Sequence, residues 1–233
     1  FEYLRWSRRY SACGSFELKA IANPENLVLL QVGNTLWKSD DEEAGIIEHV
    51  ELLQTDKEIV AASGRFATSL IARRIIWGTE TLNGSLSACV QTLLDKHILD
   101  PADADRKISF LSFAAPLIST PVNTQISCRN LMDAVTGLCE AANIGIRTVF
   151  DPAAKAFAVT LYEGAVSQAV FSREYENLTE QTYIHSVADH ADTALIGGEG
   201  EGANRVFASI IGSSGEARRE VFVDAKDLRQ EDF

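Results

Sequence analysis

The sequence predicts an α+β protein that is mainly β, with two β-rich segments flanking an α+β segment. Apolar and polar residues alternate through residues 1–64 and again from about residue 170, which is the period of a half-buried strand. Between these segments, apolar residues recur at helical spacing in two stretches, 85–99 and 129–142. We therefore expect three domains, the last of them incomplete, at residues 1–82, 83–165 and 166–233.

The first segment predicts short strands joined by tight turns. Phe16, Leu18 and Ala20 alternate with Glu17 and Lys19, which indicates a strand with one buried face. Strands at this close spacing are typical of a small barrel or a sandwich, and the pattern leaves both open.

Two hairpins follow in this segment. LVLLQ (27–31) and TLWKS, which begins at Thr35, predict strands on either side of a Gly33-Asn34 turn. The acidic run DDEE (40–43) predicts a solvated loop. A longer hairpin is expected from AGIIEHVELLQT (44–55) and EIVAASG (58–64), joined at Asp56-Lys57.

The middle segment predicts helices and strands in alternation. Ser85 is a good N-cap for the helix at 85–99, in which Leu86, Val90 and Leu93 share one face. The other elements expected here are a short helix in RFATSLIAR, a strand in RIIW, a strand in KISFLSF (107–113), the helix at 129–142, and strands in IGIRTVFD and KAFAVTLYEG. The last segment ends in two strands, RVFASIIG and REVFVDA, joined by a Ser-Ser-Gly-Glu turn.

Composition excludes some classes of function. The 233 residues carry 33 acidic and 21 basic side chains, a formal net charge of −12. A groove that grips nucleic acid needs a basic surface, so we expect no specific DNA binding. No apolar run is long enough to cross a membrane, and we expect no membrane insertion. Four cysteines without a CxxC pair, Cys13, Cys89, Cys128 and Cys139, predict reduced thiols and synthesis in a reducing cytoplasm.

None of the candidate catalytic or ligand-binding motifs has the residue spacing or the neighbouring elements that its chemistry requires. GGEGEG (197–202) has β-type sequence on both sides and two glutamates, so it predicts a hairpin tip rather than a phosphate loop. His185 and His190 lie near two aspartates without a recognised metal-ligand spacing, and DPADAD (100–105) lacks the calcium-loop glycine and glutamate. His49 and His97 are isolated, as packing or surface residues are. We expect no catalytic residue, no cofactor and no metal.

The arginines stand out because they lie within or beside predicted strands. Arg forms planar, two-bonded pairs with carboxylates and suits ion pairs at interfaces. Pairing between subunits or domains is one interpretation, and ordinary surface arginine is the other. The residues concerned are Arg5, Arg9, Arg65, Arg73, Arg74, Arg205, Arg218 and Arg219.

Six motifs in order along the chain resemble the tail-tip hub family of siphophages and prophages of Gram-positive bacteria. They are WSRRYSACGSFEL (6–18), GIIEHVE (45–51), GRFATSLIARRI (64–75), FSREYENL (171–178), GEGEGANR (198–205) and RREVFVDAKDL (218–228). Such hubs are similar to the trimeric baseplate hub of contractile tails. The resemblance implies two tube-type β-barrel-like domains flanking an inserted α+β domain.

The resemblance also implies a structural role rather than an enzymatic one. The expected protein is a homotrimer in the virion tail, assembled in the host cytoplasm, that closes the tail tube beside the distal tail and tape-measure proteins. DNA would pass through it without specific binding. The candidate interface and structural residues are Trp6, Arg5, Arg9, Arg65, Arg205, Arg218 and Arg219.

Two alternatives remain open at this stage. One is a tail-associated cell-wall hydrolase, whose carboxylates the sequence does not single out. The other is a carbohydrate-binding module for host recognition, which an exposed aromatic patch of Trp37, Trp77 and Tyr162 would favour.

Overall fold

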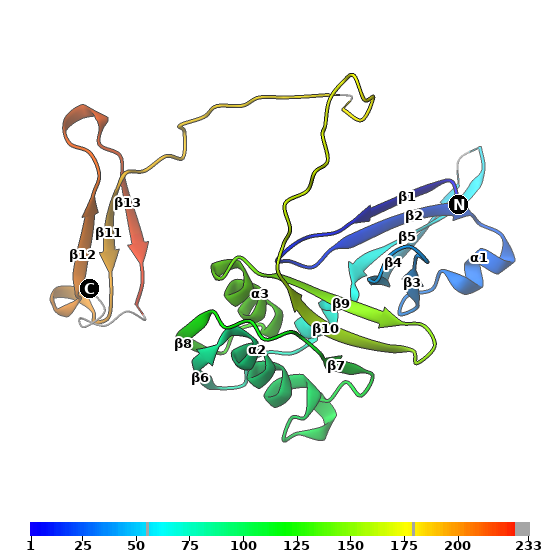
Figure 1. Cartoon of the computed structure of the whole chain (residues 1–233), viewed down its shortest axis with the longest axis horizontal. Helices are drawn as coiled ribbons and strands as arrows, with labels where there is room; N and C mark the ends of the chain where they lie inside the picture. Colours follow the sequence, from blue (N-terminus) through cyan, green and yellow to red (C-terminus); the bar gives the residue numbers. More distant parts are fainter. Residues whose placement is uncertain (55, 179, 227–233) are drawn as a thin grey trace. The chain divides into compact units, whose positions relative to one another are not determined.

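The computed structural model describes residues 1–54, 56–178 and 180–226, and the chain divides into two compact units, Phe1–Ser167 and Gln168–Phe233 (Figure 1). The fold is mainly β, as predicted. The division into three domains stays a prediction, and its first boundary falls inside strand β6 (Thr79–Ser85). No helix among the described residues is long and apolar enough to cross a membrane.

The first unit begins with a five-stranded antiparallel sheet of order β1-β2-β5-β4-β3. Phe16, Leu18 and Ala20 are buried on one of its faces, as their alternation predicts, and they pack with Val60 and Ala62. The strands are β1 (Tyr3–Ser7), β2 (Ser15–Ile21), β3 (Thr35–Trp37), β4 (Ala44–Gln54) and β5 (Glu58–Phe66).

The strand predicted at 27–31 is wrong, because this segment lies largely in helix α1 (Pro24–Leu29). Asn23 caps the helix by accepting a hydrogen bond from the Asn26 amide at 2.8 Å, and Pro24 supplies a helical φ at the first position. The helix leaves an apolar groove of about 570 Å³ against the sheet, lined by Leu4, Trp6, Leu18, Leu29 and Trp37 among others.

The second predicted hairpin is confirmed by the pairing of β4 with β5, apart from Thr55, which lies outside the described residues. A shift in register between Ile47 and His49 marks a bulge. Gly64 lies opposite this bulge, where a Cβ would stand 1.9 Å from the Ile46 carbonyl oxygen. The bulge therefore requires glycine at this position.

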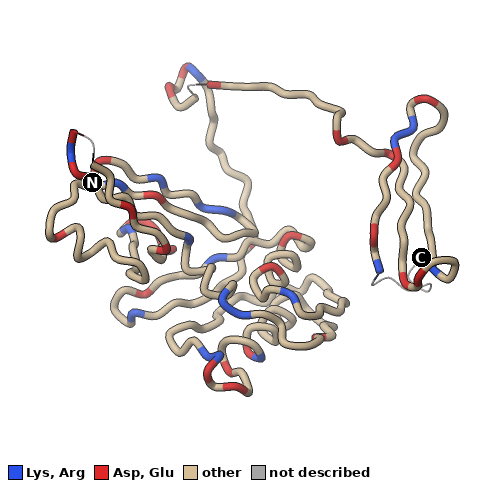
Figure 2. Tube along the Cα trace, turned by 180° about the vertical axis from the view of Figure 1, so that it is seen from behind, with Lys and Arg blue, Asp and Glu red and all other residues tan. Residues whose placement is uncertain are grey.

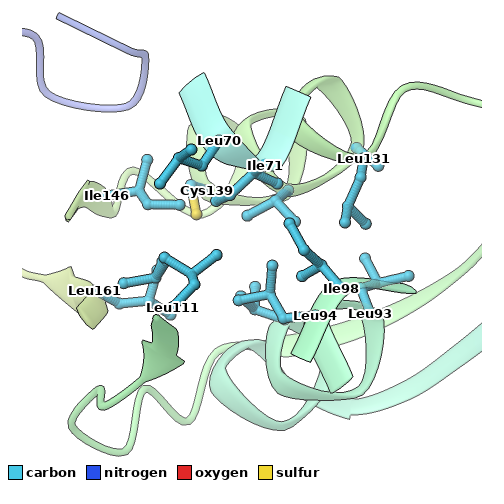
Figure 3. Close-up of a cluster of buried hydrophobic side chains, with 14 of the residues drawn as sticks. Leu70, Ile71, Leu93, Leu94, Ile98, Leu111, Leu131, Cys139, Ile146 and Leu161 are labelled. Atoms are coloured by element: carbon cyan, nitrogen blue, oxygen red, sulfur yellow. The ribbon is translucent and has the colours of Figure 1, made fainter. Parts of the chain in front are cut away.

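Helices pack beside this sheet and enclose the larger core (Figure 3). Ser85 caps α2 (Leu86–Leu94) by accepting from the Ala88 amide at 3.4 Å, and Asn130 caps α3 (Leu131–Ala141) by accepting from Met132 at 2.9 Å. These helices confirm the two predicted ones, except that α2 widens into a π-helix, η2 (Asp95–Leu99). Short 3₁₀-helices are η1 (Ala67–Arg73) and η3 (Ala104–Arg106).

The remaining strands of the first unit form two small sheets. One has the order β7 (Leu111–Phe113), β10 (Ala156–Tyr162), β9 (Gly145–Asp151), and the other pairs β6 with β8 (Pro121–Ser127). The predicted strands at 144–151 and 155–164 are confirmed, whereas KISFLSF is extended only from Leu111.

The strand predicted in RIIW is wrong, and the sequence did not predict β6 or β8. Ile75 makes only an isolated bridge to Asn130, while Ile76 is buried in the core. The strands β6 and β8 carry mainly polar residues, with Leu82 as the one fully buried side chain, so they lack a strong apolar alternation.

The second unit is a three-stranded sheet of order β12-β11-β13. The two predicted C-terminal strands exist as β12 (Phe207–Ile211) and β13 (Glu220–Asp224), but they do not pair with each other. They flank β11 (Thr193–Gly197), which the sequence did not predict. Two 3₁₀-helices, η4 (Gly202–Asn204) and η5 (Gly215–Ala217), lie in the connections, and GGEGEG joins β11 to β12 as a hairpin tip.

Gly64→Ala should destabilise the first unit by roughly 2–3 kcal/mol, because the added methyl group forces the two paired strands apart. Gly137→Ala is the matched control. Gly137 lies in α3 with open space around its Cα, so the same substitution should stabilise by up to about 1 kcal/mol. Chemical denaturation measures both, and a Gly64 variant as stable as the Gly137 variant would contradict the close approach.

Candidate functional site

A cluster of charged residues joins the start of the chain to the segment before β4. The Arg8 guanidinium donates to Glu43 through Nε, 3.0 Å from Oε2, and lies 4.0 Å from an Asp41 oxygen. The Trp6 indole donates to the same carboxylate of Asp41 at 3.0 Å. The run DDEE was predicted to be solvated, and this is wrong for Asp41 and Glu43, whose side chains are only 6% and 5% exposed.

Glu43 is a buried carboxylate that depends on Arg8. Burial raises the pKa of Glu43, and the charge and hydrogen bond of Arg8 oppose that rise. Arg8 was not among the residues singled out from the sequence, although its neighbours Arg5 and Arg9 were. It follows the end of β1, where strand alternation no longer indicates which way a side chain points.

Trp6 has a structural role in the first unit. Its ring lies 4.6 Å from that of Phe66 and 5.9 Å from that of Phe16, measured between centroids. With its nitrogen bound to Asp41, Trp6 ties β1 to the neighbouring strands and to the acidic loop.

The segment 8–14 connects this sheet to β9 and to the end of β10. The Tyr10 hydroxyl donates to the Asn143 carbonyl at 2.9 Å and accepts from the Gly164 amide at 2.8 Å. The Ile146 amide donates to the Tyr10 carbonyl at 2.9 Å. Arg147 and Glu42 add an ion pair at 2.9 Å across the same junction.

Four of the arginines singled out from the sequence have partners close by. Arg65 makes two hydrogen bonds to Glu48, at 2.9 and 2.8 Å, and these lower the pKa of Glu48. In the second unit Arg205 pairs with Asp224 and donates to the carbonyls of Gly197 and Gly198, while Arg218 pairs with Glu220 at 2.6 Å and Arg219 donates to Val187.

The arginines beside the helices differ from each other. Arg74 donates to the backbone carbonyls of Arg106 and Arg73, at 2.7 and 3.0 Å, so it holds a loop rather than an acid. Arg73 itself is exposed and makes no ion pair with any described residue.

Arg5 and Arg9 are exposed, and neither makes an ion pair within the described part of the chain. Arg5 lies on β1, an edge strand, opposite Glu17 of β2. Along the Cα trace in Figure 2, the Lys and Arg positions are interspersed with those of Asp and Glu.

The five-stranded sheet has two open edges in the described structure. One is the outer side of β1. The other is the second half of β4, since β3 pairs only with Ala44–Ile46. Glu51, an exposed residue on that half of β4, shares the outer face of the sheet with Arg5, as the registers of the intervening strands show.

The three aromatic residues considered as a carbohydrate-binding patch do not come together. Trp37 contacts Phe150 at 5.5 Å, Trp77 lies under Arg106 at 5.4 Å, and Tyr162 contacts Tyr10 at 5.4 Å. No ring contact among described residues joins these three aromatics into a patch.

The described residues also contain no group of three or more His, Cys, Asp or Glu side chains that could hold a metal ion. The four cysteines are free, and burial raises the pKa of Cys13 to about 11 and that of Cys139 to about 12. Both thiols are therefore protonated at neutral pH.

Comparison with models of protein families identifies the family of this chain. All 233 residues match the family described as siphovirus ReqiPepy6 Gp37-like protein. The chain belongs to this family. No curated protein matches it.

Solved structures show that this Gp37-like chain shares its fold with phage tail proteins. Prophage tail protein gp18 of Listeria monocytogenes aligns over 94% of the chain with a TM-score of 0.54 and 9% identity. A tail protein of Neisseria meningitidis aligns over 93% (TM-score 0.52, 12% identity), and the 43 kDa tail protein of prophage MuSo2 from Shewanella oneidensis over 97% (0.53, 11%). The chain spans 64% of the Listeria and Neisseria proteins and 73% of the Shewanella protein.

Arg8→Ala should destabilise the Gp37-like protein more at pH 7 than at pH 4. Without Arg8 the pKa of Glu43 rises further above its unfolded value of about 4.3, so stability falls as pH increases through the interval between the two values. Because Arg8 is half exposed, we expect the free energy of unfolding to fall by roughly 1–2 kcal/mol at pH 7. Thermal unfolding at both pH values measures it.

Two further variants isolate the buried carboxylate as the cause. Arg8→Ala combined with Glu43→Gln should abolish the extra loss of stability at pH 7. Arg129→Ala is the control: it removes an exposed arginine that has no ion pair among the described residues, and it should change the stability little. An equal loss at both pH values for Arg8→Ala would show that Glu43 is not responsible.

Proposed function

We propose that this chain is a structural, non-enzymatic subunit of a phage tail-tip hub, in which three copies close the tail tube. Membership of a siphovirus family and the fold shared with prophage tail proteins support a tail role. The observation that carries the assembly is the five-stranded sheet with two open edges.

Open edges of this kind favour a ring of copies. Unpaired backbone groups on an edge strand are satisfied when a strand of another chain pairs with them. Since the sheet alternates in direction across β1, β2, β5 and β4, the β1 of one copy would run antiparallel to β4 of the next. The two edges belong to different surfaces, so the contact is head-to-tail, and in the proposed hub three copies close it into a ring with cyclic symmetry.

The charges on the two edges are complementary. Arg5 on β1 is exposed and makes no ion pair with a described residue, and Glu51 on β4 is an exposed acid on the same face. Joining β1 to β4 of the next copy brings these residues together across the new strand pair. Arg9, just beyond β1, is available for a second acid of the neighbour. Arg65, Arg205, Arg218 and Arg219, by contrast, support their own units in this proposal.

The net charge fits a passage for DNA. A chain of charge −12 repels phosphate on average, so DNA and the tape-measure protein pass without being held. We place the protein in the virion tail, beside the distal tail protein, after assembly in the host cytoplasm.

Charge reversal tests the edge contact in the complete natural protein. Arg5→Glu and Glu51→Arg should each weaken the trimer about 10-fold or more, because each places like charges across the contact. The double variant restores opposite charges and should recover most of the affinity. Sedimentation equilibrium over a range of micromolar concentrations measures the association constants.

Lys155→Glu is the matched control, since Lys155 is exposed in the turn between β9 and β10 and should not affect assembly. A protein that stays monomeric at these concentrations excludes a ring-forming hub. A trimer that is insensitive to both single reversals excludes the β1–β4 contact and leaves the hub role standing.

A further inference from the structure

A second cleft lies away from the sheet edges, between the start of β6 and the end of the α2–η2 helix. Its volume is about 630 Å³, and its walls include Trp77, Glu80, Lys96, His97, Asp103 and Arg106. Trp77 is 74% exposed, and the Arg106 guanidinium lies 5.4 Å from the centroid of its ring. One large aromatic surface is thus held at the cleft while remaining open to solvent.

His97 lines the cleft as a buried polar side chain with no hydrogen bond to the described residues. Its side chain is only 5% exposed, and neither ring nitrogen has a hydrogen-bond partner among the described residues. The nearest carboxylate oxygen, Glu80 Oε1, lies 3.4 Å from Nε2. An unsatisfied buried polar group costs about 1–3 kcal/mol, and such groups in native proteins commonly serve a ligand, a water or a reaction.

The backbone that presents His97 is also unusual. The regular helix α2 ends at Leu94 and continues as the π-helix Asp95–Leu99, closed by the Asp100 amide donating to the Asp95 carbonyl at 2.9 Å. Single π-helical turns within α-helices are rare and are concentrated at functional sites. This turn carries both Lys96 and His97 to the cleft.

The acidic and basic side chains around the cleft nearly balance: Glu80, Asp100 and Asp103 lie near Lys96, Arg106 and Lys107. Lys96 pairs with Glu80 at 2.5 Å, and Asp100 pairs with Lys107 at 3.6 Å. Arg106 donates to the Ile75 carbonyl at 2.6 Å. A charged ligand would therefore meet little net field, whereas a neutral ligand with hydroxyl groups would find fixed donors and acceptors around an aromatic surface.

From these observations we infer that the cleft binds a neutral sugar ring, with the apolar face of the pyranose stacked on Trp77 and its hydroxyl groups directed to Glu80, Lys96 and Arg106. The inference does not depend on the hub role, because it rests on a different surface of the first unit. It differs from the predicted aromatic patch in that Trp77 acts without Trp37 or Tyr162.

The test uses the whole chain and a panel of neutral monosaccharides, namely glucose, galactose, mannose and N-acetylglucosamine. Saturation-transfer NMR should detect binding of at least one of them at millimolar concentration. Trp77→Ala should lower that affinity about 10-fold or more, since stacking on an aromatic ring contributes roughly that factor. His97→Gln should also weaken binding, because it removes the imidazole that lies 3.4 Å from the Glu80 carboxylate and so disturbs that wall of the cleft.

Trp37→Ala is the control, since it removes another half-exposed indole at a separate groove and should leave binding unchanged. Circular dichroism verifies that each variant folds. Binding of none of the four sugars, or equal binding by Trp77→Ala, overturns the proposal. Tighter binding of glucosamine than of N-acetylglucosamine, or of glucuronate than of glucose, by 10-fold or more overturns the assignment of a neutral ligand.

Discussion

The first unit depends on residues 6–14, which join its five-stranded sheet to the sheet that contains β9 and β10. Trp6 fills the core of the five-stranded sheet while its nitrogen binds Asp41, and Arg8 supports the buried carboxylate of Glu43. A few residues further on, Tyr10 bonds to segments next to β9 and β10. A buried charge is tolerable only when a partner compensates it, so the packing of the acidic loop depends on its contacts with the start of the chain.

The helices and long hairpins could be predicted from sequence because their signals are local. Ser85 and the apolar spacing after it specify α2 within a few residues, and alternation specifies β2 and β5. The segment 27–31 was misassigned because its apolar residues outweighed the Asn23-Pro24 helix start. The strands β6 and β8 pair through mostly polar faces, and β11 is short, so pairing across the chain rather than composition determines them.

The candidate sites were harder to predict from the sequence than the helices and strands. An arginine beside a strand indicates an ion pair but does not identify its partner. Arg65 pairs with a glutamate of its own sheet, whereas Arg8, which the sequence did not single out, supports a buried glutamate. The cleft at Trp77 brings together residues about twenty to thirty positions apart, and His97 alone gave no motif. Only the three-dimensional fold shows that its ring is buried and that its nitrogens have no hydrogen bond to a described residue.

The second unit raises a different question of stability. Both apolar core clusters of the described residues belong to the first unit, and one face of the sheet β12-β11-β13 carries only Ala194, Ile196, Ala208, Ile210, Val221 and Val223. Of these aliphatic side chains, Ile210 is 62% exposed. A small sheet with so little burial is marginal in water by itself. Any subunit contact that covered this face would link the folding of the second unit to assembly, and the stability of the unit would then rise with the concentration of subunits.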